Sequence, residues 1–160
     1  MGFAGSEPPS TEALFDLPCA CQNLRRATRI VTRIYDQELK NADLEITQFG
    51  LLTALSATGE VNQKGLSEGF VMDSTTLTRT LERMQKRGWI TVTHGTDKRE
   101  RLFSLTATGR RQIAQAKPHW ERAESRLRNE LGERGWNDMK KAVSLVTKGA
   151  IAAQSFLHRR

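Results

Sequence analysis

The sequence contains few of the residues that build disulfide frameworks or metal centres. Its only cysteines are Cys19 and Cys21, and its three histidines (His94, His119 and His158) are scattered along the chain. A structural zinc site needs four clustered ligands, and two cysteines separated by one residue form a strained disulfide. We therefore expect no metal, no cofactor and a reduced, intracellular pair of thiols.

Long apolar runs are also missing. No run approaches the roughly 18 residues that a membrane-spanning helix requires, and the N-terminus lacks the basic and apolar segments of a secretory signal. Hydrophobic residues make up 38% and charged residues 27% of the 160 positions, a balance typical of a soluble domain. We expect a cytoplasmic protein with no membrane partner.

The sequence has no constellation of catalytic residues. It contains neither a glycine-rich phosphate loop nor paired carboxylates, and no histidine lies near Cys21 in the chain to act as its base. These absences argue against an enzyme. A thiol peroxidase that uses Cys21 is the remote alternative, and peroxide turnover by the protein alone would support it.

What the sequence does have is positive charge. The net charge is +7 and the sequence pI is about 9.9. Residues 1–18 carry three acids and no Lys or Arg, and residues 19–60 are balanced, whereas residues 61–111 and 112–160 each hold ten basic against five acidic side chains. An excess of this kind favours a polyanionic partner such as a nucleic acid.

Helical spacing of apolar residues organises the first half of the chain. Residues 1–16 are rich in Gly, Pro and Ser, and we expect a flexible N-terminal arm. The spacing predicts helices from Asn23 to Leu39, from a cap at Thr47 to about Gly59, and over residues 62–69, followed by a tight turn at 70–73.

The stretch DSTTLTRTLERMQKRG (residues 73–88) predicts a further helix. Leu77, Leu81 and Met84 recur at helical spacing, with an N-cap at Asp73 or Ser74 and an end at Gly88. The opposite side carries hydroxyl and basic residues, namely Thr75, Thr76, Arg79, Arg83 and Lys86. A solvated surface is the ordinary explanation of such a face, and the neighbouring elements decide between it and a binding surface.

A predicted β-hairpin follows this helix. WITVT (89–93) and RLFSL (101–105) are extended runs, separated by the polar segment HGTDKRE. Helix, short helix, turn, helix and hairpin form a winged helix-turn-helix, whose second helix enters the major groove of DNA. We therefore predict that Thr75, Thr76, Arg79 and Arg83 read bases, and that Ser74 and Thr78 contact phosphates. A non-specific architectural DNA-binding protein is the alternative.

The C-terminal third is helical again. Thr106 is a candidate cap for a helix with an apolar stripe from Ile113 to Leu131, bent at Pro118, and a last helix carries a stripe from Trp136 to Ala150. Together with the stripe at 24–39, these stripes form a larger apolar surface than a small DNA-reading lobe can cover. We expect them to pair with a second copy in a homodimer, and packing within one chain is the alternative.

Three stretches of the sequence resemble the MarR family of bacterial transcription regulators. They are ITQFGLLTAL (46–55), LSEGFVMDSTTLTRTLERMQKRGWI (66–90) and DKRERLFSLTATG (97–109), the last with the D-x-R element formed by Asp97 and Arg99. The resemblance covers roughly residues 20–155. It implies one mostly α domain at 17–158, with a winged-helix DNA-binding lobe and hairpin wing at 44–110, and dimerisation helices at 17–43 and 111–158.

The resemblance also implies how DNA is bound and released. The hairpin tip would enter the minor groove, where Arg99 inserts and Asp97 orients its guanidinium, although an ordinary ion pair in a turn is the alternative for these two residues. MarR-like proteins bind pseudo-palindromic operators and usually act as repressors. They release DNA when a small aromatic molecule binds or when a thiol is oxidised.

The first helix carries a weaker resemblance to the organic-hydroperoxide-sensing branch of the family. Cys21 and Tyr35 are fourteen residues apart, as in that branch, but Arg25 and Ile46 stand where it has further tyrosines. Because a straight helix of this length spans about 21 Å, a hydrogen bond from Tyr35 to Cys21 requires the partner subunit.

Cys21 is the candidate redox sensor. Arg25 and Arg26 lie one turn away and would favour its thiolate, and Cys19 could trap a sulfenic acid across the twofold axis. An inert buried cysteine is the alternative. Redox sensing, sensing of a small ligand and no sensing therefore all stay open.

Overall fold

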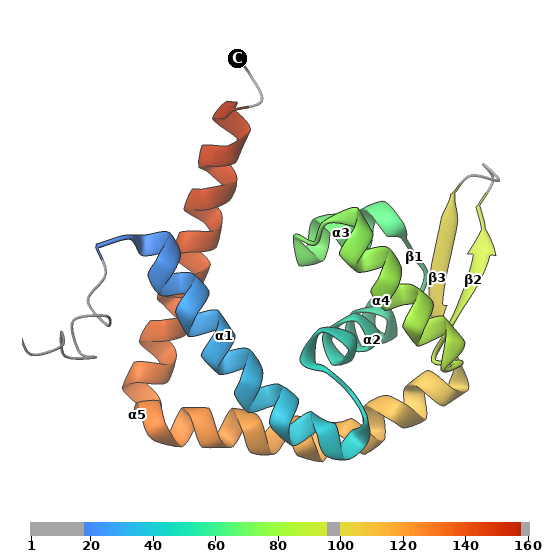
Figure 1. Cartoon of the computed structure of the whole chain (residues 1–160), viewed down its shortest axis with the longest axis horizontal. Coiled ribbons are helices and arrows are strands. Elements are labelled where there is room, and N and C mark those ends of the chain that lie inside the picture. The colour runs from blue at the N-terminus through green and yellow to red at the C-terminus, as the bar shows by residue number, and fades with distance from the viewer. Residues whose placement is uncertain (1–17, 96–99, 158–160) are drawn as a thin grey trace, which may run out of the picture.

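The structure is a computed structural model that describes residues 18–95 and 100–157. Figure 1 shows a mostly helical chain with a small sheet. The elements are α1 (Ala20–Leu39), the short 3₁₀-helix η2 (Lys40–Ala42), α2 (Ile46–Thr58), β1 (Val61–Asn62), α3 (Gln63–Phe70), α4 (Ser74–Lys86), β2 (Ile90–His94), β3 (Arg101–Leu105) and α5 (Ala107–Leu157). This arrangement confirms the predicted fold class.

Two of the helix caps follow from local sequence. Asp73 caps α4 as predicted, because its Oδ1 accepts a hydrogen bond of 2.9 Å from the Thr76 backbone N–H. A hydrogen bond with the Thr76 side chain, together with this backbone bond, lowers the pKa of the Asp73 carboxyl. Thr106 likewise caps α5, since its Oγ1 accepts from the Gly109 backbone N–H at 3.0 Å. Both caps satisfy a free N–H in the first turn of their helix.

The predicted cap of α2 at Thr47 is wrong. The N-cap residue is Glu45, two residues earlier, and the helix begins at Ile46, whose backbone N–H donates to Oδ1 of Asp36 at 2.7 Å. Gln48 Oε1 accepts from the backbone N–H of Glu45 at 3.1 Å and supports the same turn. A side chain of α1 therefore helps to start α2, and ten positions of sequence separate the two partners.

The sheet has a third strand that periodicity did not predict. β1 pairs antiparallel with β3, with Val61 opposite Phe103 and Asn62 opposite Leu102. β3 in turn pairs with β2, so the strand order is β1-β3-β2. A strand of two residues is too short to show an alternating pattern in sequence. It places the start of α3 directly beside the hairpin (Figure 1).

The core of the winged-helix lobe joins α2, α4 and the hairpin. Its fully buried side chains are Leu51, Leu52, Leu55, Leu77, Leu81, Met84, Ile90 and Phe103. Burial of a large aliphatic or aromatic side chain contributes about 1.5–3 kcal/mol. One face of α4 is thereby fixed against the lobe, and the opposite face is left to solvent.

The two C-terminal helices form one element with a sharp kink. α5 has non-helical backbone angles at Gly132, with φ 65° and ψ 167°. Figure 1 shows a sharp turn within α5. Pro118 lies inside the helix, and the break in helical geometry is at Gly132. Glycine adopts positive φ without steric cost.

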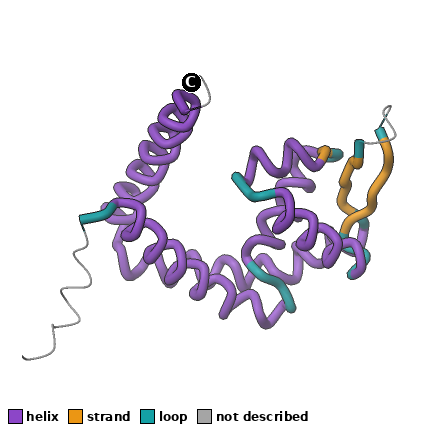
Figure 2. Tube along the Cα trace, turned by 45° about the horizontal axis from the view of Figure 1, so that its top comes forward, coloured by secondary structure: helices purple, strands orange, loops and turns teal. Residues whose placement is uncertain are grey.

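α1 packs along α5, and their outer ends stay uncovered. Tyr35, Leu39, Ala116 and Ala123 join the common core. Large apolar side chains elsewhere on these two helices are exposed: Leu24, Ile30, Leu131, Val143, Leu145, Val146 and Ile151. Figures 1 and 2 show the last part of α5 projecting away from the winged-helix lobe. Within the described ranges, none of the helices has the length and apolar character to cross a bilayer.

Candidate nucleic-acid interface

The outward face of α4 combines hydroxyl and charged side chains. Thr75, Arg79, Glu82 and Lys86 are exposed, and they lie opposite the buried residues of the same helix. Arg79 and Lys86 have no ion-pair partner in the part of the chain that the structure describes. Two cationic side chains are therefore free on this surface to meet an anion.

Thr78 lies on a flank of α4 and is already engaged. Its hydroxyl donates to the Ser74 carbonyl at 2.7 Å and accepts from Gln63 Nε2 at 2.8 Å. A phosphate accepts hydrogen bonds, and the single proton of this hydroxyl is in use. Thr78 thus holds α4 against the start of α3. Sequence reasoning missed Gln63, which lies fifteen positions away.

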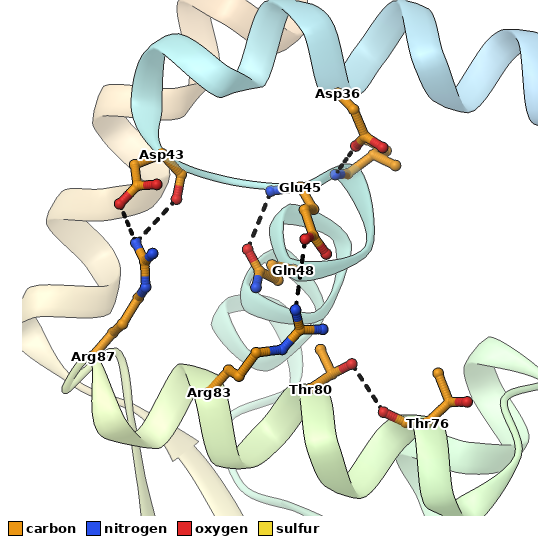
Figure 3. A network of polar contacts seen from close by, with 9 residues as sticks. Asp36, Asp43, Glu45, Gln48, Thr76, Thr80, Arg83 and Arg87 are labelled. Atoms are coloured by element: carbon orange, nitrogen blue, oxygen red, sulfur yellow. Dashed lines mark hydrogen bonds and ion pairs between the residues drawn. The ribbon is translucent and has the colours of Figure 1, made fainter.

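Arg83 lies on the other flank and turns toward its own lobe. Its Nη1 is 3.6 Å from Oε1 of Glu45 at the start of α2. Figure 3 shows Arg83 and Arg87 reaching from α4 to the junction between α1 and α2. Arg87 pairs with the Asp43 carboxylate, and its Nη1 also donates to the Asp43 carbonyl at 3.2 Å.

These pairs border a charged cleft of about 650 Å³ between the end of α1, the start of α2 and α4. Both Arg83 and Glu45 are more than half exposed, so their ion pair contributes roughly 0–1 kcal/mol. A pair of this strength orients Arg83 without locking it. Neither ion pair was predictable from the sequence, because acidic and basic residues are common on protein surfaces.

The hairpin is attached to the rest of the lobe at both ends. Thr106 donates its hydroxyl to the Gly88 carbonyl at 2.6 Å, and its backbone N–H donates to the Trp89 carbonyl at 3.0 Å. On the β1 side, Asn62 Nδ2 donates to Glu100 Oε1 at 2.6 Å. The predicted minor-groove residues Asp97 and Arg99 lie outside the described residues.

Comparisons with known proteins identify the family of this chain. A model described as the MarR family matches residues 44–100. The structure of the M. tuberculosis transcriptional regulator MosR in complex with DNA is 31% identical, with a TM-score of 0.76, and the match covers 84% of this chain and 98% of MosR. The chain belongs to the MarR family.

Further relatives agree with this assignment. The uncharacterized HTH-type transcriptional regulator YwoH of Bacillus subtilis (strain 168) is 29% identical over 83 residues, which are 52% of this chain and 61% of YwoH. The chain thus spans about three fifths of that curated relative. A mutant of MarR from E. coli, complexed with operator DNA, shares the fold with a TM-score of 0.72 at 20% identity, covering 79% of this chain and 91% of that one.

The two cysteines of this MarR-family transcriptional regulator lie at the start of α1. Cys19 is its N-cap residue and Cys21 is in the first turn, and both thiols are free and exposed. In the single chain, Cys21 is therefore exposed and not buried. Cys21 borders a mainly apolar surface cleft of about 480 Å³ together with Leu24, Arg25, Thr28 and Arg29.

Tyr35 has a different partner from the one predicted. Its hydroxyl donates to the carboxylate of Glu124 on α5 of the same chain. Burial and this carboxylate raise the pKa of Tyr35 well above its ordinary value of 10.0. The Tyr35 hydroxyl, which was expected to donate to Cys21 of a partner subunit, thus donates to Glu124. A hydrogen bond from Tyr35 to the Cys21 sulfur would have to replace this bond.

A third cleft, of about 470 Å³, lies beside Glu124 at the kink of α5. Trp120 and Trp136 line it, together with Arg128 and Lys140. Trp120 also stacks on Phe49, with 5.9 Å between ring centroids, so one wall of the cleft contacts α2 of the winged-helix lobe. Among the described residues, no three His, Cys, Asp or Glu side chains are grouped to hold a metal ion.

Proposed function

We propose that this protein is a sequence-specific DNA-binding regulator of the MarR family. The observation that carries the proposal is α4, whose apolar face is buried while Thr75 and Arg79 stand free on the opposite face. In a winged helix-turn-helix this face enters the major groove, where arginine reads guanine through two hydrogen bonds. MosR, which is 31% identical, has been solved in complex with DNA.

The surrounding residues have assigned parts in this proposal. Ser74 and Thr76 at the start of α4 meet phosphates or bases, because the first N–H groups of a helix favour anions there. Arg83 reads bases only after it leaves Glu45. Arg99, oriented by Asp97, fills the minor groove, as the family resemblance implies. Arg99→Ala is expected to weaken binding broadly and to reduce its salt dependence.

The active form in this proposal is a homodimer on a pseudo-palindromic operator. The exposed apolar residues of α1 and α5, among them Leu24, Ile30 and Val146, supply the surface that a second copy covers. A twofold axis then places two copies of α4 in successive turns of the major groove. We further propose that the bound dimer represses transcription.

Two signals are candidates for release of the DNA. The cleft at Trp120 and Trp136 suits a small aromatic molecule, because its walls offer ring faces and its rim offers cations. The exposed thiols of Cys19 and Cys21 suit oxidation, with Cys21 forming a sulfenic acid that Cys19 traps as a disulfide. Either event would act on the helices that set the spacing of the two α4 helices.

Selection of bound sequences from random duplex DNA tests the central proposal. The full chain should enrich an inverted repeat, and Arg79→Ala should lose discrimination at defined base pairs. Arg134→Ala removes the same charge from an exposed site beyond the kink of α5 and serves as the matched control. Equal affinity for all sequences would instead identify an architectural DNA-binding protein.

Operator binding before and after mild organic hydroperoxide tests the redox signal. Wild type should lose binding, whereas Cys21→Ser should retain it. Unchanged binding in both proteins would exclude Cys21 as the sensor. A screen of small aromatic acids, read by tryptophan fluorescence and operator release, then tests the cleft at Trp120.

A further inference from the structure

Asn62 is one side chain that holds two DNA-binding elements together. It lies at the end of β1, directly before α3, and opposite Leu102 of β3. Its Oδ1 accepts from the Gly65 backbone N–H at 2.8 Å and so caps α3. Its Nδ2 donates to Glu100 Oε1 at 2.6 Å, where the hairpin begins its return strand. Both ends of the amide are therefore used.

The neighbouring residue continues the connection to α4. Gln63 donates from Nε2 to Thr78 Oγ1 at 2.8 Å. Asn62 thus contacts the hairpin and Gln63 contacts α4, so these two neighbouring residues connect the two elements. The backbone attachment of β1 to β3 consists of only two residue pairs, so it leaves much of the hairpin angle to side-chain contacts. Thr93 adds one exposed contact, to Glu60 Oε2 at 3.0 Å.

The surroundings of Glu100 have room for this bond because residue 95 is glycine. A Cβ atom on Gly95 would lie 2.7 Å from Oε2 of Glu100 and would displace the carboxylate. The Gly95 backbone N–H donates to the Glu100 carbonyl at 3.0 Å, which fixes the same residue in the hairpin. The position of the Glu100 carboxylate is thus set by contacts on both sides of the hairpin.

We propose that Asn62 is a positioning residue that sets the angle between the β2–β3 hairpin and α4, through its bond to Glu100. The inference rests on the proposed function, because the angle matters only when α4 and the hairpin occupy adjacent grooves of one DNA site. Asn62 then fixes the distance between the major-groove contact and the flanking minor-groove contact in each half-site, without touching a base.

Asn62→Asp separates this role from helix capping. Aspartate caps a helix as well as asparagine does, so α3 and the melting temperature should be retained. The new carboxylate cannot donate to Glu100 and repels it. On the operator selected by wild type, affinity should fall about tenfold, the usual effect of losing a charge-assisted hydrogen bond. Hydroxyl-radical footprints should lose protection in the flanking minor groove and keep it in the central major groove.

Two further variants complete the test. In Glu100→Gln the new amide oxygen still accepts from Asn62, so binding should stay within about twofold of wild type. The double variant Asn62→Asp/Glu100→Gln restores a donor and an acceptor with their roles exchanged, and it keeps the net charge of wild type. It should recover the flanking footprint and most of the affinity.

The outcomes distinguish this inference from the proposed function. Wild type that selects no operator would refute the function itself. Wild type that binds its operator while Asn62→Asp shows an unchanged footprint would refute the positioning role. Affinity that falls in Asn62→Asp and fails to recover in the double variant would also refute it, because a restored donor and acceptor would then have failed to restore binding.

Discussion

Gly109 allows close packing where α4, the hairpin and α5 meet. It lies in the first turn of α5, where Thr106 reaches back to the carbonyls of Gly88 and Trp89. A Cβ atom at position 109 would lie 2.2 Å from the Trp89 carbonyl oxygen and 2.6 Å from Leu105 Cδ1. The close approach of helix and strand therefore requires glycine here.

Gly109→Ala is expected to destabilise the fold. Overpacking against a backbone atom typically costs about 1–3 kcal/mol, and urea unfolding measures it. Gly149→Ala in the same helix is the control, because its Cβ would meet nothing within 4 Å. That change should stabilise the protein by up to about 1 kcal/mol through helix propensity. Equal effects at both sites would contradict the packing argument.

The bond between Tyr35 and Glu124 gives a pH-dependent contribution to stability. Since the folded state raises the pKa of Tyr35 above 10.0, folding retains a proton that the unfolded chain loses at alkaline pH. The contribution is complete below pH 10.0 and diminishes above it. Tyr35→Phe should be less stable by about 1–3 kcal/mol at neutral pH. The difference from wild type should shrink above pH 10.0, as followed by urea unfolding at stepped pH.

At the scale of elements, α4 has four sides with different surroundings. Its inner side packs on the core, one flank is bound to α3 through Thr78, and the other is bound to α2 through Arg83. Only the outer side, with Thr75 and Arg79, is without a partner in the described chain. In the proposed function, Arg83 must leave its ion pair with Glu45 before it contacts DNA.

Glu45→Gln tests this dependence. If Arg83 reads a base, freeing it from Glu45 should strengthen operator binding by up to about fivefold, the value of an exposed ion pair. The gain should vanish in the double variant with Arg83→Ala. Glu121→Gln breaks the exposed pair with Lys117 on α5 and makes the same charge change, so it is the control. Equal gains in affinity in both single variants would show that the change in net charge alone causes the effect.

At the scale of the whole molecule, the exposed apolar residues fall on defined faces of α5. Val143 and Val146 lie on the stripe that runs from Trp136 to Ala150, and they are 54% and 44% exposed. Leu145 is 73% exposed and lies on the opposite side of the helix. A dimer that buries the stripe should cover well over about 1,000 Å².

Sedimentation at micromolar concentration should show a dimer that Val146→Glu dissociates. Leu145→Glu introduces the same charge one residue away and should leave the dimer intact. The operator affinity of Val146→Glu should fall with its dimer content, because both half-sites must be occupied together. A wild-type monomer that binds the operator tightly would contradict the homodimer.

Much of the fold and part of the site were predictable from local sequence. The apolar spacing of α1, α2 and α4, the caps at Asp73 and Thr106, and the two extended runs of the hairpin each depend on residues a few positions apart. Short-range patterns of this kind record backbone geometry directly. They also identified the free outer face of α4, because its inner face is fixed by the same periodicity.

Only the tertiary structure decided which polar groups meet. Tyr35 and Glu124 are 89 positions apart, Asn62 and Glu100 are 38 apart, and β1 forms only because β3 lies beside it. The kink of α5 at Gly132 and the start of α2 at Ile46, which donates to Asp36 of α1, likewise depend on the folded backbone. A hydrogen bond requires two groups within about 3 Å, and sequence spacing fixes that distance only within one helix or turn. The sequence thus determined the elements, and packing determined their partners.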